Sequence, residues 1–193
     1  MKITPLLAIA GLVIKGGTLQ GTQLFTDVTA ASGIKVNLEK RPGHPEYGTQ
    51  RPHGVAVEDF DGDGLQDILL VCFGEPYVQL FRNAGGMKFV DVTKGSGLEI
   101  FKGWGTGAAV GDFNRDGKLD VYLTSVAWEK EDRAKSKKDW ESRLFEGRGG
   151  GKFVDVSAKA GVLLDRPGRC CAWSDVDGDG WLDLFVACPN TPS

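Results

Sequence analysis

This sequence of 193 residues has no large excess of acidic or basic residues, and it contains few histidines and few long apolar runs. The formal net charge is only −3, so the chain lacks the basic excess typical of a nucleic-acid-binding protein. Its two histidines are His44, in a Pro/Gly-rich stretch, and His53, at the start of an expected strand, and they form no catalytic set. With 41% apolar and 25% charged residues, the composition is that of one ordinary globular domain.

Cysteine is also sparse, and its spacing lacks the CxxC pattern of a zinc site. The four cysteines are Cys72, Cys170, Cys171 and Cys188. Cys72 and Cys188 occupy matching places in two sequence repeats, where the middle repeat has Ser125. This match predicts a small buried side chain. A disulfide from Cys170 or Cys171 to Cys188 is an open alternative in an oxidising compartment, because these residues flank one expected hairpin.

The N-terminus holds the longest apolar run, from Ile3 to Ile14. This run is too short to span a bilayer, but it fits the central region of a secretory signal peptide. We therefore predict a signal peptide over residues 1–20 and a repeat domain over residues 21–193. A buried first strand is the alternative interpretation of the same run.

Glycine, in contrast, is abundant at 28 residues, about twice its average share. This abundance favours many turns and short strands over long helices. The chain also repeats itself, because one segment begins at Phe25, Phe89 and Phe153, at intervals of 64 residues. Its copies read FTDVTAASGI (25–34), FVDVTKGSGL (89–98) and FVDVSAKAGV (153–162).

Between these segments, apolar residues alternate or run over five or six positions, and glycine-rich or acidic turns bound them. Each unit of roughly 50–64 residues therefore holds four short strands, which is the pattern of a β-propeller blade. The predicted fold class is all-β, a partial β-propeller of four-stranded antiparallel blades. The first complete blade has the strand order GVAVEDF, DILLVCF, YVQLF and KFVDVT.

The number of blades is too small to close a ring. FTDVT at 25–29 corresponds to the fourth strand of a preceding blade, two full blades follow, and a third reaches only its second strand. A propeller closes with roughly four to eight blades. We therefore expect missing blades from a longer chain or a partner chain, which would cover the strand edges.

Three acidic loops follow one nine-residue template. Positions 1, 3, 5 and 9 carry oxygen-bearing side chains, position 6 is glycine, and position 7 can offer its backbone carbonyl. The predicted metal ligands are Asp59, Asp61, Asp63, Leu65 and Asp67 in the first loop, Asp112, Asn114, Asp116, Lys118 and Asp120 in the second, and Asp175, Asp177, Asp179, Trp181 and Asp183 in the third.

An all-oxygen ligand set in a tight turn suits Ca²⁺ rather than zinc or copper. Four carboxylates about 5 Å apart repel one another by a total on the order of 5–20 kcal/mol, which rivals the stability of a whole domain. A bound divalent ion reverses the sign of this term. We therefore predict about three Ca²⁺ ions, one per hairpin loop, with the weakest binding in the second loop, where Asn114 removes one charge.

An EF-hand shares the first part of this template but requires a bidentate glutamate at position 12. The three loops have Leu70, Leu123 and Val186 at that position, and their expected flanks are strands. The EF-hand interpretation therefore fails.

These loops resemble FG-GAP/VCBS repeats, the calcium-loop blades of integrin α-subunit propellers. The FxDVTxxSGI segment before each loop is most similar to the secreted ASPIC/cartilage-acidic-protein-like branch, and VCFGEP at 71–76 is similar to the segment that names the repeat. The resemblance covers residues 21–188. It departs at Gln66, where the other loops have Leu119 and Leu182, and at a long insertion in the middle blade.

Two insertions interrupt the repeats. The stretch 128–143 has mixed charges and is expected to be a solvated excursion, with Trp128 and Trp140 packing it onto the sheet or, alternatively, forming a ligand platform. The stretch 37–52 is rich in proline and glycine. It holds Arg41, His44, Tyr47 and Arg51, which we interpret as surface residues but which offer an alternative ligand site.

The resemblance implies a secreted or periplasmic calcium-binding module for protein or glycan binding and adhesion, in which calcium is mainly structural. We predict no enzyme, because we find no Ser/His/Asp set and no paired acids outside the metal loops. Two alternatives stay open: a propeller part of a calcium-dependent polysaccharide lyase or hydrolase, and a purely architectural repeat of a large surface protein.

Overall fold

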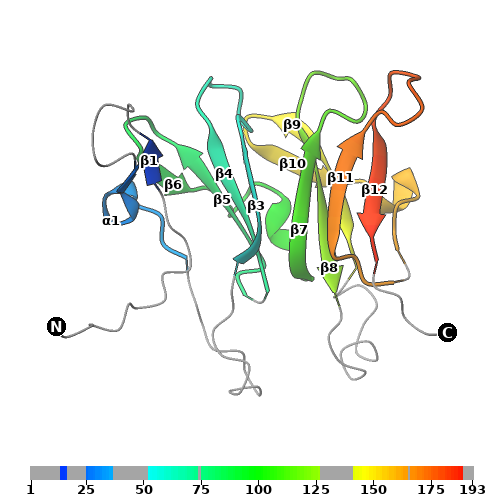
Figure 1. Cartoon of the computed structure of the whole chain (residues 1–193), viewed down its shortest axis with the longest axis horizontal. Coiled ribbons are helices and arrows are strands. Elements are labelled where there is room, and N and C mark those ends of the chain that lie inside the picture. The colour runs from blue at the N-terminus through cyan, green and yellow to red at the C-terminus, as the bar shows by residue number, and fades with distance from the viewer. Residues whose placement is uncertain are drawn as a thin grey trace, which may run out of the picture.

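The computed structural model describes residues 14–16, 25–36, 52–73, 75–126, 141–164 and 166–188. Several predictions concern residues outside these ranges. They include the signal peptide apart from residues 14–16, the alternative ligand site in the first insertion, and the roles of Trp128 and Trp140. Within the described ranges most of the regular secondary structure is β-strand, as predicted (Figure 1).

Two four-stranded antiparallel sheets have the predicted strand order. The first sheet runs β3-β4-β5-β6 and the second runs β7-β8-β9-β10, so each strand pairs with its neighbour in the sequence. The strands are β3 (Pro52–Glu58), β4 (Asp67–Cys72), β5 (Val78–Asn83), β6 (Phe89–Asp91), β7 (Trp104–Gly111), β8 (Asp120–Val126), β9 (Arg143–Gly149) and β10 (Lys152–Asp155).

Two further sheets have two strands each among the described residues. One pairs β11 (Cys170–Ser174) with β12 (Asp183–Ala187), in agreement with the first two strands of a third unit. The other pairs β1 (Ile14–Gly16) with β2 (Phe25–Asp27), so the first three residues of the FTDVT segment form a strand. Short helical turns follow β2, β6 and β10, namely α1 (Thr29–Ser32), η2 (Leu98–Ile100) and α3 (Ser157–Ala160). In the described part of the chain, no helix has the length and apolar character needed to cross a bilayer.

The continuous apolar run of β4 reflects burial on both faces of the sheet. Leu69 and Val71 belong to the core between the first and second sheets. Leu70 and Cys72 lie on the opposite face, where Ile34 and Val36 pack against their cluster. An antiparallel strand with one solvated face would alternate apolar and polar residues, whereas a strand covered on both faces does not.

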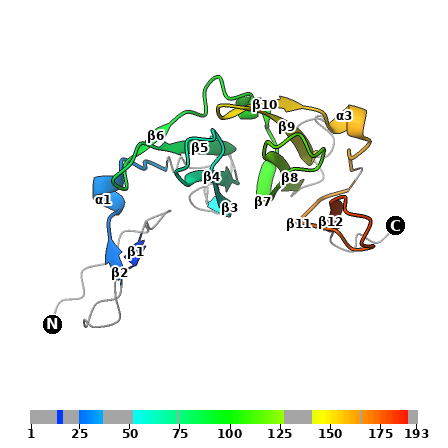
Figure 2. The ribbon, with the colours of Figure 1, turned by 90° about the horizontal axis from the view of Figure 1, so that it is seen from above.

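The sheets stand side by side along an arc, with β3, β7 and β11 on its inner side and β6 and β10 on its outer side (Figure 2). The inner strands approach closely: a Cβ atom added to Gly54 of β3 would lie 2.8 Å from the Cα atom of Gly107 of β7. Glycine is therefore required sterically where these two strands meet.

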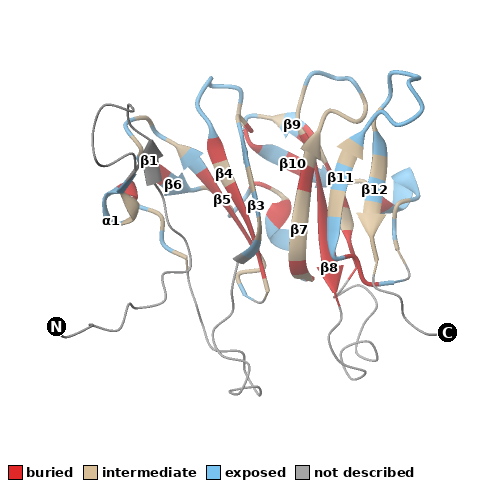
Figure 3. Ribbon diagram, viewed as in Figure 1, coloured by how far each residue is buried: buried red, intermediate tan, exposed pale blue. Residues whose placement is uncertain are grey.

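Burial is concentrated in the first and second sheets and falls off in the third (Figure 3). Leu69 of β4 and Tyr122 of β8 are fully buried, whereas Phe185, at the matching position of β12, is 70% exposed. The third sheet therefore presents an apolar side chain at a position that is covered in both preceding sheets.

Candidate metal-binding loops

The three acidic loops join the first and second strands of their sheets, β3 to β4, β7 to β8 and β11 to β12, as predicted. All three lie at the same end of the molecule, at the top of Figure 1. The glycines at position 6, Gly64, Gly117 and Gly180, have φ angles of 87°, 81° and 87°. This left-handed conformation explains the choice of glycine, because a Cβ atom disfavours it.

The first loop is held in shape by its own aspartates. One carboxylate oxygen of Asp59 accepts the N–H groups of Gly62 and Asp63 at 2.8 and 3.1 Å, and the other accepts that of Gly64 at 2.8 Å. Asp61 accepts the N–H of Asp63 at 3.1 Å. These bonds fold the chain back on itself and place alternate side chains on the inside of the turn.

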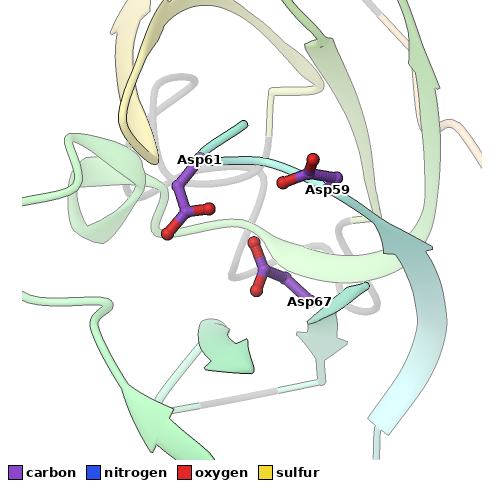
Figure 4. A group of neighbouring side chains, drawn as sticks. All are labelled: Asp59, Asp61 and Asp67. Carbon is purple, nitrogen blue, oxygen red and sulfur yellow. The ribbon is translucent and has the colours of Figure 1, made fainter. Parts of the chain in front are cut away.

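The first loop brings three predicted ligands together. The carboxylates of Asp59, Asp61 and Asp67 are turned toward one another (Figure 4), and one oxygen from each lies within 4.8 Å of the others. In the third loop, Asp175, Asp177 and Asp183 form the same kind of group. Three carboxylate oxygens at this separation suit a hard divalent cation, so the donor set fits calcium.

The remaining predicted ligands of these two loops lie outside the three-carboxylate groups. Asp63 and Asp179, at position 5, each accept the N–H of the residue at position 7, at 2.8 Å in both loops. Their second carboxylate oxygens remain for an ion. That the carbonyl groups of Leu65 and Trp181 bind metal stays a prediction.

The second loop has the same backbone pattern, but one of its aspartates is bonded to a lysine side chain of the same loop. Asp112 accepts the N–H groups of Asp116 and Gly117 at 3.0 and 2.8 Å, as Asp59 does in the first loop. The ammonium group of Lys118, at position 7, donates to Asp116 Oδ2 at 2.9 Å. This hydrogen bond lowers the pKa of Asp116. A metal ion in this loop would therefore compete with Lys118, in addition to lacking the charge that Asn114 replaces.

The aspartates at position 9 have a second, structural role that the sequence analysis missed. Asp67 accepts the N–H of Phe60 at 3.1 Å and the N–H of Asn83 at 2.8 Å. Asp120 accepts those of Phe113 and Gly147 at 2.9 and 2.8 Å. Both carboxylates are buried, and this burial raises their pKa values.

Each of these two aspartates therefore ties the start of its loop to the third strand of its sheet. Asp183, in the third loop, is exposed and accepts the N–H of Val176 at 3.0 Å. The signal for the structural role was the position of each aspartate directly before a buried apolar strand.

A pocket of about 430 Å³ adjoins the first loop, between the first and second sheets. Its lining includes the acidic residues Asp61 and Asp63 and the basic residues Arg82 and Lys152. The sequence analysis did not single out either cation, because they lie 70 residues apart and come together only when the two sheets pack.

The four cysteines are free thiols. Cys170 lies opposite Ala187 in the pairing of β11 with β12. Cys72 is buried, as its place in the repeat predicted, and burial raises its pKa to about 11, whereas Cys188 at the matching place is only partly buried. The disulfide alternative is therefore absent from this structure.

The fold and the loops together define an all-β repeat protein, in which an acidic hairpin loop joins the first two strands of three successive antiparallel sheets. Residues 59–123 match the model of the FG-GAP-like repeat family. Over these residues, the match confirms the resemblance seen in the sequence. The matched residues include the first two acidic loops.

Three curated relatives share the name cartilage acidic protein 1. The protein from Xenopus tropicalis is 29% identical over 135 residues, and those from Mus musculus and Homo sapiens are 25% and 29% identical over 190 and 166 residues. These alignments cover 68%, 91% and 86% of this chain but only 19%, 27% and 22% of the relatives. The chain thus spans roughly a fifth to a quarter of the length of the relatives it matches.

Proposed function

We propose that this chain is a non-catalytic repeat module of an extracellular protein, in which calcium stabilises the sheets and the surface binds a protein or glycan ligand. The observation that carries the proposal is the pair of three-carboxylate groups, Asp59/Asp61/Asp67 and Asp175/Asp177/Asp183. They occupy equivalent loops of the sequence repeat, the first of which lies in the part matched by the FG-GAP-like family, and each gathers negative charge that a divalent cation neutralises.

The role of calcium is structural in this proposal. Each loop connects two strands, and Asp67 also bonds to the third strand through Asn83. An ion bound by Asp59, Asp61 and Asp67 would join the end of β3 to the start of β4 and so stabilise the strand pairing beyond it. Binding free energy at such a site is folding free energy, because the unfolded chain does not hold the three oxygens together.

An extracellular location is supported by the kind of site and by the relatives. Loops of this type suit the millimolar calcium found outside cells. The name of the relatives, cartilage acidic protein, refers to a tissue that is rich in extracellular matrix. The signal peptide predicted over residues 1–20 agrees with this location.

Aromatic side chains at the end of the sheets opposite the loops offer a surface for a ligand. The ring centroids of His53 and Phe73 are 5.1 Å apart, and those of Phe73 and Trp104 are 4.8 Å apart. His53 is exposed, and the other two side chains are partly exposed. Rigid aromatic rings of this kind provide contact area in protein interfaces at little entropic cost.

The third sheet supports the proposal that further blades pack against this chain, supplied by a longer chain or by a partner. Phe185 is 70% exposed, although its counterparts Leu69 and Tyr122 are fully buried by a neighbouring sheet. An additional blade would cover this side chain as the second and third sheets cover the other two.

Thermal unfolding with calcium and then with a chelator tests the proposal. At a concentration 100 times the dissociation constant, one site adds about 2.7 kcal/mol, which corresponds to a rise of roughly 5–10 °C in the midpoint. Asp61→Asn retains an oxygen for the N–H of Asp63 but removes one charge from the metal group, so we expect it to reduce the rise.

Glu58→Gln is the matched control, because it removes one negative charge beside Asp59 at a position outside the template. We expect this variant to keep the full calcium response. Identical midpoints with calcium and with chelator, for protein shown to be metal-free at the start, would refute the structural role of calcium.

A further inference from the structure

Arg115 is an exception among the residues at position 4 of the loops. It has a φ angle of 59°, in the left-handed region, whereas the first and third loops have glycines there, Gly62 and Gly178, with φ angles of 82° and 78°. A residue with a Cβ atom is disfavoured in this conformation. The second loop therefore places an arginine at a position where the backbone favours glycine, and the reason lies in the contacts of its side chain.

The side chain of Arg115 crosses from the second loop to the third. Its guanidinium carbon lies 4.2 Å from the centroid of the Trp181 ring, which is a cation–π contact. A Cβ atom added to Gly180 would lie only 2.6 Å from a guanidinium nitrogen of Arg115. Arg115 thus covers positions 6 and 7 of the third loop, and glycine at position 6 leaves room for it.

We propose that Arg115 is a positioning residue that couples the second and third loops, so that a cation bound in one loop raises the affinity of the other. This inference rests on the proposed calcium binding. Arg115 lies between Asn114 and Asp116, two predicted metal ligands. Coordination of an ion by these two residues would therefore restrict the backbone of Arg115. The other end of the side chain restrains Gly180 and Trp181, and the carbonyl of Trp181 is a predicted ligand.

The physical basis of the coupling is conformational entropy. Ordering the second loop orders Arg115, and Arg115 then restricts the backbone at positions 6 and 7 of the third loop before an ion arrives there. Linkage requires the effect to be reciprocal. The first loop has Gly62 at this position and therefore lacks such a side chain. Lys118, the other long cationic side chain of the second loop, donates its hydrogen bond to Asp116 within that same loop.

The charge of Arg115 acts in the opposite direction, because a cation near the third loop repels a second cation. The two effects make different predictions. If charge dominates, Arg115→Gly strengthens calcium binding in the third loop and Arg115→Lys leaves it unchanged. If positioning dominates, both variants weaken it, since an ammonium group does not replace a planar guanidinium stacked on a ring.

Calorimetric calcium titrations in an Asp61→Ala background, which removes one ligand from the first loop, measure the coupling. With Arg115 present, disabling the second loop by Asp116→Asn is expected to lower the affinity of the third loop at least fivefold, the lower end of typical coupling factors. With Arg115→Gly, the same Asp116→Asn change is expected to have less than a twofold effect. Equal effects in the two backgrounds would overturn the proposal.

Amide hydrogen exchange without calcium provides a second measurement that does not depend on metal binding. The N–H groups of Gly180 and Trp181 donate to Asp175 and Asp179 at 2.9 and 2.8 Å. We expect Arg115→Gly to accelerate their exchange severalfold.

The matched internal controls are the amides of Gly64 and Leu65, which make the same bonds in the first loop. Their exchange is expected to stay unchanged. Unchanged exchange at Gly180 and Trp181 would refute the positioning role. A complete lack of calcium binding, in contrast, would refute the proposed function itself.

Discussion

The ammonium group of Lys152 donates a hydrogen bond to the carbonyl oxygen of Gly95 at 3.0 Å, and this bond joins the last strand of the second sheet to the turn that follows the first sheet. Lys88 donates to the carbonyl oxygen of Ala31 in the same way. Both members of the first pair lie 64 residues after their counterparts in the second, which is the interval of the sequence repeat. The repeat therefore reproduces a contact between sheets as well as the sheets themselves.

The same junction requires glycine. Phe153 donates its N–H to the carbonyl oxygen of Ser96 at 2.7 Å, which brings the backbones of the two sheets together. A Cβ atom added to Gly97 would lie 2.0 Å from the carbonyl oxygen of Phe153, and one added to Gly33 would lie 2.9 Å from that of Phe89. Each of these glycines also has a positive φ angle.

Gly97→Ala is expected to destabilise the protein by about 2–5 kcal/mol. About 1–2 kcal/mol comes from the left-handed backbone, and the remainder from overpacking against Phe153. Gly85→Ala is the matched control, because Gly85 has a φ angle of 83° and no atom within 4 Å of its added Cβ. Urea unfolding measures both variants. Equal losses of unfolding free energy would show that the junction tolerates a side chain.

Asp120→Asn is expected to destabilise the calcium-free protein by about 1–3 kcal/mol. The buried carboxylate accepts the N–H groups of Phe113 and Gly147 through different oxygens, and an amide side chain has only one acceptor. Asp183→Asn is the control at the same template position. Asp183 is exposed and accepts only the N–H of Val176 among the described residues, so we expect a loss below about 1 kcal/mol. Unfolding in urea with a chelator separates this structural effect from metal binding.

The strand order and the three hairpin loops could be predicted from the sequence because both depend on local patterns. Apolar runs of strand length mark β4 and β8, and a nine-residue template marks each loop. The template recurs in three units, so the prediction did not depend on a single isolated match.

Contacts between repeats were not predictable in the same way. The bond from Lys152 to Gly95 and the stacking of Arg115 on Trp181 join residues that are distant in the sequence. Each depends on the direction of a long side chain after the sheets have packed. The double role of Asp67 was missed for a related reason, since its partner Asn83 belongs to a different strand.

Lys118→Met is expected to strengthen calcium binding in the second loop by about two- to fivefold. The ammonium group of Lys118 bonds to Asp116 Oδ2 at 2.9 Å, the oxygen that an ion would use, and an exposed pair of this kind contributes less than about 1 kcal/mol. Lys94→Met, which removes an exposed lysine outside the loops, is the control. Calorimetry in an Asp61→Ala, Asp177→Ala background, which removes one ligand from each of the other two loops, isolates the second loop. An unchanged affinity would mean that Lys118 leaves Asp116 freely when calcium binds.

The pH dependence of stability tests the role of Glu99 at the junction between the first and second sheets. Its carboxylate accepts the N–H groups of Gly95 and Gly97 at 2.7 and 2.6 Å. Burial alone would raise the pKa of Glu99, but these backbone donors and the hydroxyl of Ser96 together lower it from its ordinary value of 4.5. A lowered pKa in the folded state means that the unfolded chain binds the proton more tightly. The stabilisation is therefore complete above pH 4.5 and is lost as the pH falls through the lowered value.

Glu99→Gln is accordingly expected to be less stable than the wild type at pH 7 and to approach it in stability as the solution is acidified. Urea unfolding of both proteins at a series of pH values between 7 and about 3, with chelator present, measures this convergence. Glu58→Gln, which removes an exposed carboxylate away from the junction, controls for general charge effects. A constant difference between Glu99→Gln and the wild type across this range would show that the charge of Glu99 does not hold the turn at Gly95 and Gly97. The backbone junction at Gly95 and Gly97 would then depend on Lys152, Phe153 and the absence of a side chain at Gly97 rather than on the charge of Glu99.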